Sequence, residues 1–221
     1  MNVTTIVEPA AEPVTLAQVY LQLRLDYTVD SSPSETSHPM DPVLTGNIRT
    51  AREQVERISR RSLIEQTLRL SMPAFPAATA CEWWPTASAV PRRIKLIRPP
   101  LIRVTSVRYF DAENVLRTID PADYYVTDDL VPELRFVTGF ARPVTYDRPD
   151  ALRVEYVAGY LGTGSPPTTQ AELAANVPQA LKDAVLIGVE LLQGDAGPDD
   201  RVALERLRDA LLSPLVVLLE P

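Results

Sequence analysis

Chemically reactive side chains are scarce in this sequence. Its 221 residues include one cysteine, Cys81, and one histidine, His38. A single cysteine excludes an internal disulfide, and one cysteine with one histidine cannot complete a four-ligand zinc site. A histidine-based catalytic triad would have to use His38, which lies in a polar stretch, and no Gly-x-Ser-x-Gly motif accompanies it. We therefore expect no catalytic residue, no metal and no cofactor.

Glycine is also scarce, and three of the 8 glycines fall in one stretch, V-E-Y-V-A-G-Y-L-G-T-G-S. A phosphate-binding loop places such glycines between a strand and a helix N-terminus. Gly159, Gly162 and Gly164 do follow an apolar run, but two prolines come next and the following helix is expected only near Pro178. No Gly-Lys-Ser/Thr occurs in the chain. We interpret these glycines as a flexible exit from a strand.

Basic residues are fewer than acidic residues in this chain. The chain has 22 Lys and Arg against 29 Asp and Glu, a net charge of −7, whereas a protein that grips nucleic acid needs a basic surface. A local basic patch is possible in the most basic stretch, which contains Arg92, Arg93, Lys95, Arg98, Arg103 and Arg108. No apolar run reaches the 18 residues of a membrane helix, and residues 1–13 do not resemble a secretory signal. We expect a soluble protein made in a cytoplasm.

Two amphipathic helices are predicted near the N-terminus, after an extended arm over residues 1–13. A Thr15-x-x-Gln18 capping box opens the first, which ends near residue 25. Asp41, as N-cap, followed by a proline opens the second, whose apolar positions continue to Ile58. We expect residues 26–40 to form a polar loop. The outer face of the second helix is expected to carry the pairs Arg49/Glu53, Arg52/Glu56 and Glu53/Arg57.

The middle of the chain is typical of β structure, and its end returns to helix. Strands are expected near residues 64–72, 93–97, 103–110, 115–119, 123–127, 134–138 and 151–158, with a long loop over residues 73–92 that carries Trp83 and Trp84. One helix is expected from Pro178 to Gly194, and Asp199 is expected to cap a last helix that Pro214 ends.

The predicted fold class is α+β, with a small helical core of about four helices from both chain ends and an inserted β-rich lobe. The expected parts are residues 1–63 (arm and two helices), 64–160 (β-rich lobe), 161–212 (two helices) and 213–221 (tail).

Two further kinds of site would use acidic residues. The spacing of Asp195, Asp199 and Asp200 does not match a calcium-binding loop. A hydrolase or carbohydrate-binding module on the β-rich lobe would use Trp83 and Trp84 with acidic turns; the acidic candidates are Asp123, Asp128, Asp129, Glu133 and Asp150. Solvated turns and aromatic packing are the ordinary explanation for all of these.

The tail is unusual because Leu215–Leu219 is an apolar, strand-like run at the end of the chain. Such a segment either folds back onto its own sheet or adds to a partner's sheet.

Short motifs across the chain resemble the head–tail connector (adaptor, or head-completion) proteins of tailed phages and phage-derived gene transfer agents. In chain order they are P-V-T-L-A-Q-V from Pro13, I-R-T-A-R-E-Q-V-E-R from Ile48, L-I-E-Q-T from Leu63, P-P-L-I-R-V-T-S-V from Pro99, D-P-A-D-Y from Asp120, R-V-E-Y-V-A-G-Y from Arg153, V-P-Q-A-L-K from Val177 and L-L-S-P from Leu211. The sequence departs from the family at Ser59-Arg60-Arg61, where Thr-Gly is common, and at the end of the third helix, Leu192-Gln-Gly194.

The resemblance implies a structural virion protein at the head–tail interface, or neck, made in the bacterial host. It implies a closed ring of twelvefold symmetry, attached beneath the portal protein, that extends the DNA channel without binding DNA specifically and receives the next neck protein. It implies no membrane partner. The portal-binding segment would be Pro214, Leu215, Val216, Val217, Leu218, Leu219, Glu220 and Pro221. Another neck or tail protein, such as a stopper or tail terminator, is the alternative.

Overall fold

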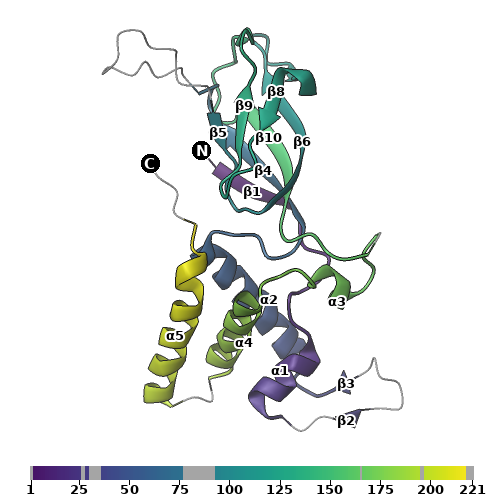
Figure 1. The fold of residues 1–221 in the computed structure, drawn as a ribbon, viewed down its shortest axis with the longest axis vertical. Helices are drawn as coiled ribbons and strands as arrows, with labels where there is room; N and C mark the ends of the chain where they lie inside the picture. The colour runs from purple at the N-terminus through teal and green to yellow at the C-terminus, as the bar shows by residue number, and fades with distance from the viewer. Residues whose placement is uncertain are drawn as a thin grey trace. The chain divides into compact units, whose positions relative to one another are not determined.

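The computed structural model describes residues 2–25, 28–29, 36–76, 93–164, 166–194 and 197–217. The chain divides into two compact units (Figure 1). We call residues 1–8 with 66–159 the β unit, and residues 9–65 with 160–221 the helical unit. Helices from both chain ends form one unit, and the β-rich middle forms most of the other, which confirms the predicted α+β class.

The β unit is built from two antiparallel sheets. The larger has the order β1-β4-β10-β6-β7, and the smaller has the order β5-β9-β8. The strands are β1 (Asn2–Val7), β4 (Gln66–Met72), β5 (Arg93–Lys95), β6 (Leu101–Phe110), β7 (Leu116–Thr118), β8 (Tyr124–Val126), β9 (Glu133–Phe136) and β10 (Leu152–Ala158), with a 3₁₀ turn at Pro121–Asp123. Each predicted strand from β4 to β10 is present within a few residues of its expected bounds.

Side chains from both sheets share one apolar core. Leu68 and Leu70 of β4 lie in register with Tyr156 and Val154 of β10, and all four are fully buried. The same cluster contains Ile94, Leu134 and Phe136 of the smaller sheet. The larger sheet therefore has an apolar inner face. Because successive side chains of a strand point to opposite faces, the residues between these core positions lie on the outer face.

The N-terminal arm belongs to the larger sheet rather than standing apart from it. Asn2–Val7 pairs antiparallel with β4, from Asn2 opposite Ser71 to Val7 opposite Thr67. Its run of β-branched residues favours this extended pairing. The expectation of an extended backbone was right for Asn2–Val7. Grouping the arm with the first two helices was wrong for residues 1–8, whereas residues 9–13 do belong to the helical unit.

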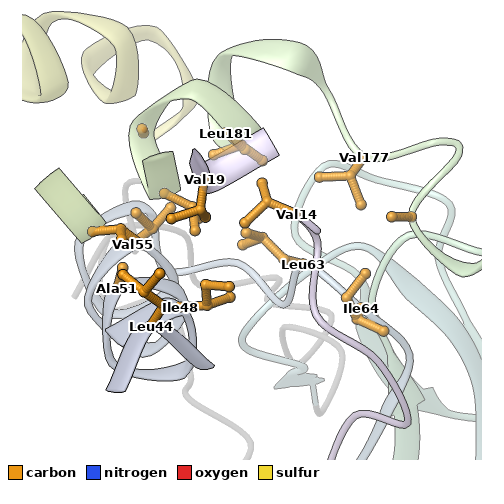
Figure 2. Close-up of a cluster of buried hydrophobic side chains, with 14 of the residues drawn as sticks. Val14, Val19, Leu44, Ile48, Ala51, Val55, Leu63, Ile64, Val177 and Leu181 are labelled. Carbon is orange, nitrogen blue, oxygen red and sulfur yellow. The ribbon is translucent and has the colours of Figure 1, made fainter. Parts of the chain in front are cut away.

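The helical unit contains α1 (Leu16–Leu23), α2 (Asp41–Ser59), the short α3 (Gln170–Leu173), α4 (Gln179–Gln193) and α5 (Pro198–Leu212), followed by a 3₁₀ turn (Ser213–Leu215). Apolar side chains of α1, α2 and α4 meet in one core, which Figure 2 shows around Val19, Val55 and Leu181. The strands β2 (Thr28–Val29) and β3 (Thr36–Ser37) pair inside the predicted loop 26–40.

The residues at the helix N-termini agree with only some of the capping predictions. The Thr15–Gln18 capping box is present, with both reciprocal hydrogen bonds. Asp41 is not the N-cap of α2: Met40 holds that position, and Asp41 is the first helical residue. The N-cap of α5 is Gly197, not Asp199, which lies in the first turn. In both helices proline lies within the first two positions, and the acidic side chain favours the positive end of the helix.

Candidate assembly surfaces

Arginine side chains pair with two of the acidic residues considered for catalysis. Glu133 is buried in the smaller sheet and pairs with Arg93 and Arg135. Asp150 accepts hydrogen bonds from Arg148 and Arg153, which lower its pKa to about 2. A general acid needs a pKa near the working pH, so Asp150 does not suit that role.

The remaining acidic candidates lie on turns beside a short strand. Asp123 belongs to the 3₁₀ turn before β8, and Asp128 with Asp129 follows β8 in exposed positions. Trp83 and Trp84 lie outside the described residues, as do Cys81 and Asp195. Within the described ranges, no group of three or more His, Cys, Asp or Glu side chains is arranged to hold a metal ion.

The glycine stretch folds against α3 instead of opening a phosphate site. Gly159 and Gly164 have φ of 130° and 99°, values that favour glycine. A Cβ on Gly162 would lie 3.0 Å from the carbonyl oxygen of Glu172. The Glu172 carboxylate accepts from the backbone N–H groups of Thr168 and Thr169, which lower its pKa. A side chain of the protein therefore already occupies the start of this short helix.

His38 has a local structural role. Its Nδ1 accepts a hydrogen bond from the backbone N–H of Met40 at 3.1 Å, and its own backbone N–H donates to the Asp41 carboxylate. The buried Tyr20 hydroxyl donates to the same carboxylate, and these hydrogen bonds lower the pKa of Asp41. His38 thus helps to fix the start of α2 against α1.

The start of the tail lies against the end of α2. Arg60 ends α2 with φ of 56°, and the residues on either side of it hold the tail. The Arg61 Nε donates to the carbonyl oxygen of Leu215 at 2.8 Å. The backbone N–H of Val217 donates to the carbonyl oxygen of Ser59 at 3.1 Å. We call Ser59, Arg61, Leu215 and Val217 the tail clasp.

The clasp bears on the portal-binding segment expected from the sequence. Val217 is 1% exposed, whereas Pro214 is exposed. Residues 213–215 form a 3₁₀ turn, so this part of the tail neither extends the protein's own sheet nor forms a strand. Leu218, Leu219, Glu220 and Pro221 lie outside the described residues.

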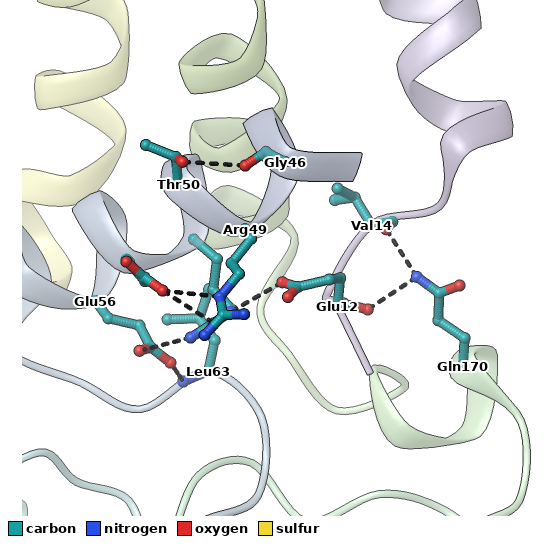
Figure 3. Close-up of polar contacts among 10 residues, drawn as sticks. Glu12, Val14, Gly46, Arg49, Thr50, Glu56, Leu63 and Gln170 are labelled. Atoms are coloured by element: carbon teal, nitrogen blue, oxygen red, sulfur yellow. Dashed lines mark hydrogen bonds and ion pairs between the residues drawn. The ribbon is translucent and has the colours of Figure 1, made fainter. Parts of the chain in front are cut away.

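A buried ion-pair network supports the helical unit from within. Arg52 and Glu56 of α2 are 2% and 3% exposed, so the prediction that they lie on the outer face was wrong. Arg52 Nε donates to Glu12 at 2.8 Å and its Nη1 donates to Glu56 at 3.1 Å. The other Glu56 oxygen accepts from the backbone N–H of Leu63 (Figure 3). Burial raises the pKa of Glu12, against the lowering effect of Arg52.

The network also joins two segments that are far apart in the sequence. Gln170 of α3 donates from its side-chain amide to the carbonyl oxygens of Glu12 and Val14, as Figure 3 shows. The segment before α1 is thereby held between α2 and α3. Neither Glu12 nor Gln170 was singled out from the sequence, because their partners lie 40 and more than 150 residues away.

The outer face of the larger sheet carries a cluster of arginines, which we call the arginine face: Arg69, Arg103, Arg108, Arg148 and Arg153. At its centre Glu155 binds Arg69 at 2.7 Å and Arg108 at 2.5 Å. Burial acts to raise the pKa of Glu155, but the hydrogen bonds from these two arginines outweigh it and the pKa is lowered. The guanidinium groups of Arg148 and Arg153 lie 3.7 and 4.7 Å from the ring centre of Phe110.

Arg103 and Arg108 come from the basic stretch noted in the sequence, whose other described members lie elsewhere. Arg93 and Lys95 belong to the smaller sheet, and Arg98 lies between the strands with φ of 63°. The stretch therefore does not form one continuous patch on a single strand. Among the described helices, none has both the length and the apolar character needed to span a bilayer.

Comparison with solved structures finds the same fold along the whole chain. A chain in the neck of an empty gene transfer agent particle, computed with C6 symmetry, matches with a TM-score of 0.66 and 18% identity. A chain in the virion of a native gene transfer agent matches with a TM-score of 0.66 and 17% identity. A chain in the neck of a native particle, computed with C12 symmetry, matches at 0.61 and 16%.

Each of these matches covers 100% of this chain and 98% of the other. No family model matches the sequence, and no curated protein sequence matches it. The chain therefore has the fold of proteins found in gene transfer agent particles, two of them in the neck. This finding agrees with the resemblance to head–tail connectors that the sequence motifs carry.

Proposed function

We propose that the chain is a structural, non-catalytic protein of the neck of a phage-like particle, and that it forms the head–tail adaptor ring. The observation that carries the proposal is the fold match along the entire chain to proteins of gene transfer agent necks. In this role the ring binds beneath the portal, extends the DNA channel and receives the next neck protein. The particle that contains it is assembled in the bacterial host.

The symmetry of those assemblies supports a closed ring. The two matching necks were computed with C6 and C12 symmetry, and a ring of identical chains forms when heterologous contacts close. We propose twelve copies around the channel. DNA passes through without specific binding, which suits the net charge of −7 because like charge disfavours retention of the duplex.

We assign the portal contact to Pro214–Pro221. The tail clasp supports a division of labour inside this segment: Leu215 and Val217 anchor it to α2 through their backbone groups. Pro214 and the last four residues, Leu218–Pro221, are then the part that contacts the portal. An apolar segment held at its base costs less entropy to dock than one that is free along its whole length.

Binding to isolated portal rings tests the proposal. The full chain, a form lacking residues 218–221 and a form lacking residues 213–221 are each compared for retention on immobilised portal. We expect the full chain to bind and both truncated forms to lose at least about tenfold in affinity. The shorter truncation leaves the clasp intact, so it separates loss of contact from loss of the anchor.

Rings of tail-tube protein are the matched control, because a stopper or tail terminator would bind them in preference to the portal. Binding to the tail tube alone would indicate that the chain is another neck protein and not the adaptor. Portal binding that both truncations leave unchanged would retain the adaptor and remove the tail from its contact surface.

A further inference from the structure

The arginine face is a positively charged surface of the β unit. Along β10, Arg153 and Glu155 alternate with Val154 and Tyr156, which are fully buried in the core between the sheets. Arg153 lies opposite Arg108 of β6, and Glu155 lies opposite Arg69 of β4. Residues opposite each other on antiparallel strands share a face, so these side chains all lie on the face that points away from the core.

A β-bulge brings a further arginine to this face. Arg103 and Arg108 are five residues apart, which would put them on opposite faces of a regular strand. The register of β6 against β10 shifts between Ser106 and Val104, so that Arg103 lies opposite Val157. Val157 shares a face with Glu155, and Arg103 therefore joins the arginine face.

The positive charge on this face exceeds the negative charge. Four of its arginines share two carboxylates: Glu155 pairs with Arg69 and Arg108, and Asp150 pairs with Arg148 and Arg153. The face thus retains positive charge after its own carboxylates are paired, which suits an anionic partner surface.

The complementary charge lies in the helical unit. That unit contains 17 Asp and Glu against 10 Lys and Arg, a net of −7, whereas the β unit contains 12 of each. Glu190 of α4 and Asp200 of α5 line one open groove, together with the single basic residue Arg24. Glu190 accepts from the side-chain amide of Gln22 at 2.9 Å, so its partner there is neutral and its charge is not cancelled.

We propose that the arginine face of one copy binds the acidic α4–α5 surface around Glu190 and Asp200 of the neighbouring copy. The proposal rests on the ring of the proposed function, because two different, complementary patches on one chain make the head-to-tail contact that a ring needs. DNA is the less suitable partner, since the net charge of −7 repels a polyanion at long range. Four of the arginines are also already held by Glu155 and Asp150 in fixed positions that suit discrete carboxylates.

A charge-swap experiment tests the contact in the full chain. Variant one carries Arg69→Glu and Arg103→Glu; variant two carries Glu190→Arg and Asp200→Arg. Assembly is measured as copies per portal ring by native mass spectrometry and, without portal, as cross-linked oligomers. We expect each variant alone to need at least about tenfold more protein to assemble.

An equimolar mixture of the two variants is expected to recover assembly, because every contact in an alternating ring then pairs opposite charges. Thr4→Glu with Arg103→Glu is a milder form of variant one that keeps Arg69 in its pair with Glu155, since Thr4 lies opposite Arg69 on exposed β1. Circular dichroism checks that each variant is folded.

The proposed contact would be overturned if both variants assembled as well as the wild type. It would also be overturned if both variants were folded and their mixture did not recover assembly. If variant one assembled normally but retained less duplex DNA than the wild type, the arginine face would be a DNA-binding surface and not a contact between copies. A wild-type chain that does not bind the portal at all would be a failure of the proposed function, and the cross-linking without portal would still decide the contact.

Discussion

The Arg61 guanidinium and the Leu215 carbonyl oxygen lie 2.8 Å apart, although 154 residues separate them in the chain. With the hydrogen bond from Val217 to Ser59, this contact sets where the tail leaves the helical unit. A segment proposed to dock on a partner thus begins from a fixed point on the protein's own α2.

Substitution of Arg61 should loosen the tail without unfolding the protein. We expect Arg61→Gln to raise hydrogen exchange at the Val217 amide about tenfold, because the neighbouring charged hydrogen bond to Leu215 is lost. The neighbouring Arg60 is exposed, so Arg60→Gln is the matched control and should leave that amide unchanged. Equal exchange in both variants would show that the clasp does not hold the tail.

Arg52 should be the most costly arginine to replace in the helical unit. Arg52→Met leaves the carboxylates of Glu12 and Glu56 without their buried cation, and we expect a loss of about 3–5 kcal/mol in the free energy of unfolding. Arg49 makes an exposed pair with Glu53, so Arg49→Met should cost under about 1 kcal/mol. Urea unfolding followed by the helical circular dichroism signal measures both. Similar losses for the two would contradict the importance of the buried network.

Two glycines in the helices should respond in opposite directions to alanine. A Cβ on Gly188 of α4 would lie 3.0 Å from the Cβ of Ala51 in α2, whereas nothing lies within 4 Å of one on Gly46. We expect Gly188→Ala to destabilise by about 1–3 kcal/mol through overpacking. Gly46→Ala should stabilise by up to about 1 kcal/mol through helix propensity. Thermal unfolding compares them, and a stabilising Gly188→Ala would show that α2 and α4 can separate at little cost.

The ion pairs of Asp150 should stabilise the β unit at neutral pH, and this contribution should be lost in acid. Its pKa is lowered from 3.8 to about 2 by Arg148 and Arg153. A lowered pKa gives stability that is present above 3.8 and is lost as the pH falls towards 2. Because the carboxylate is 30% exposed, we expect Asp150→Asn to cost only about 1 kcal/mol at neutral pH.

The difference between wild type and Asp150→Asn should then shrink to nearly zero near pH 2. Thermal unfolding as a function of pH gives the comparison. A difference that stays constant from neutral pH to pH 2 would mean that the ion pairs contribute nothing that depends on the charge of Asp150.

Local patterns in the sequence predict most of the elements of the fold. The Thr15–Gln18 box and the apolar spacing of α2 and α4 are encoded within a few residues, as is the alternation along β10. Such short-range signals survive folding because burial only selects the face that they already define.

The features that sequence reasoning missed depend on distant partners. Arg52 has the spacing of an exposed i,i+4 pair, and only Glu12 and the covering segment before α1 make it a buried residue. A bulge against β10 sets the face of Arg103, and the end of α2 covers Val217. None of these contacts leaves a periodic signal in the sequence around the residue.

Imaging of the full chain bound to purified portal rings is the decisive test of the adaptor assignment. We predict a closed ring of twelve copies, coaxial with the portal and continuous with its channel. Density that is absent, that lies off the axis, or that forms only on the end of the tail tube would contradict the adaptor assignment.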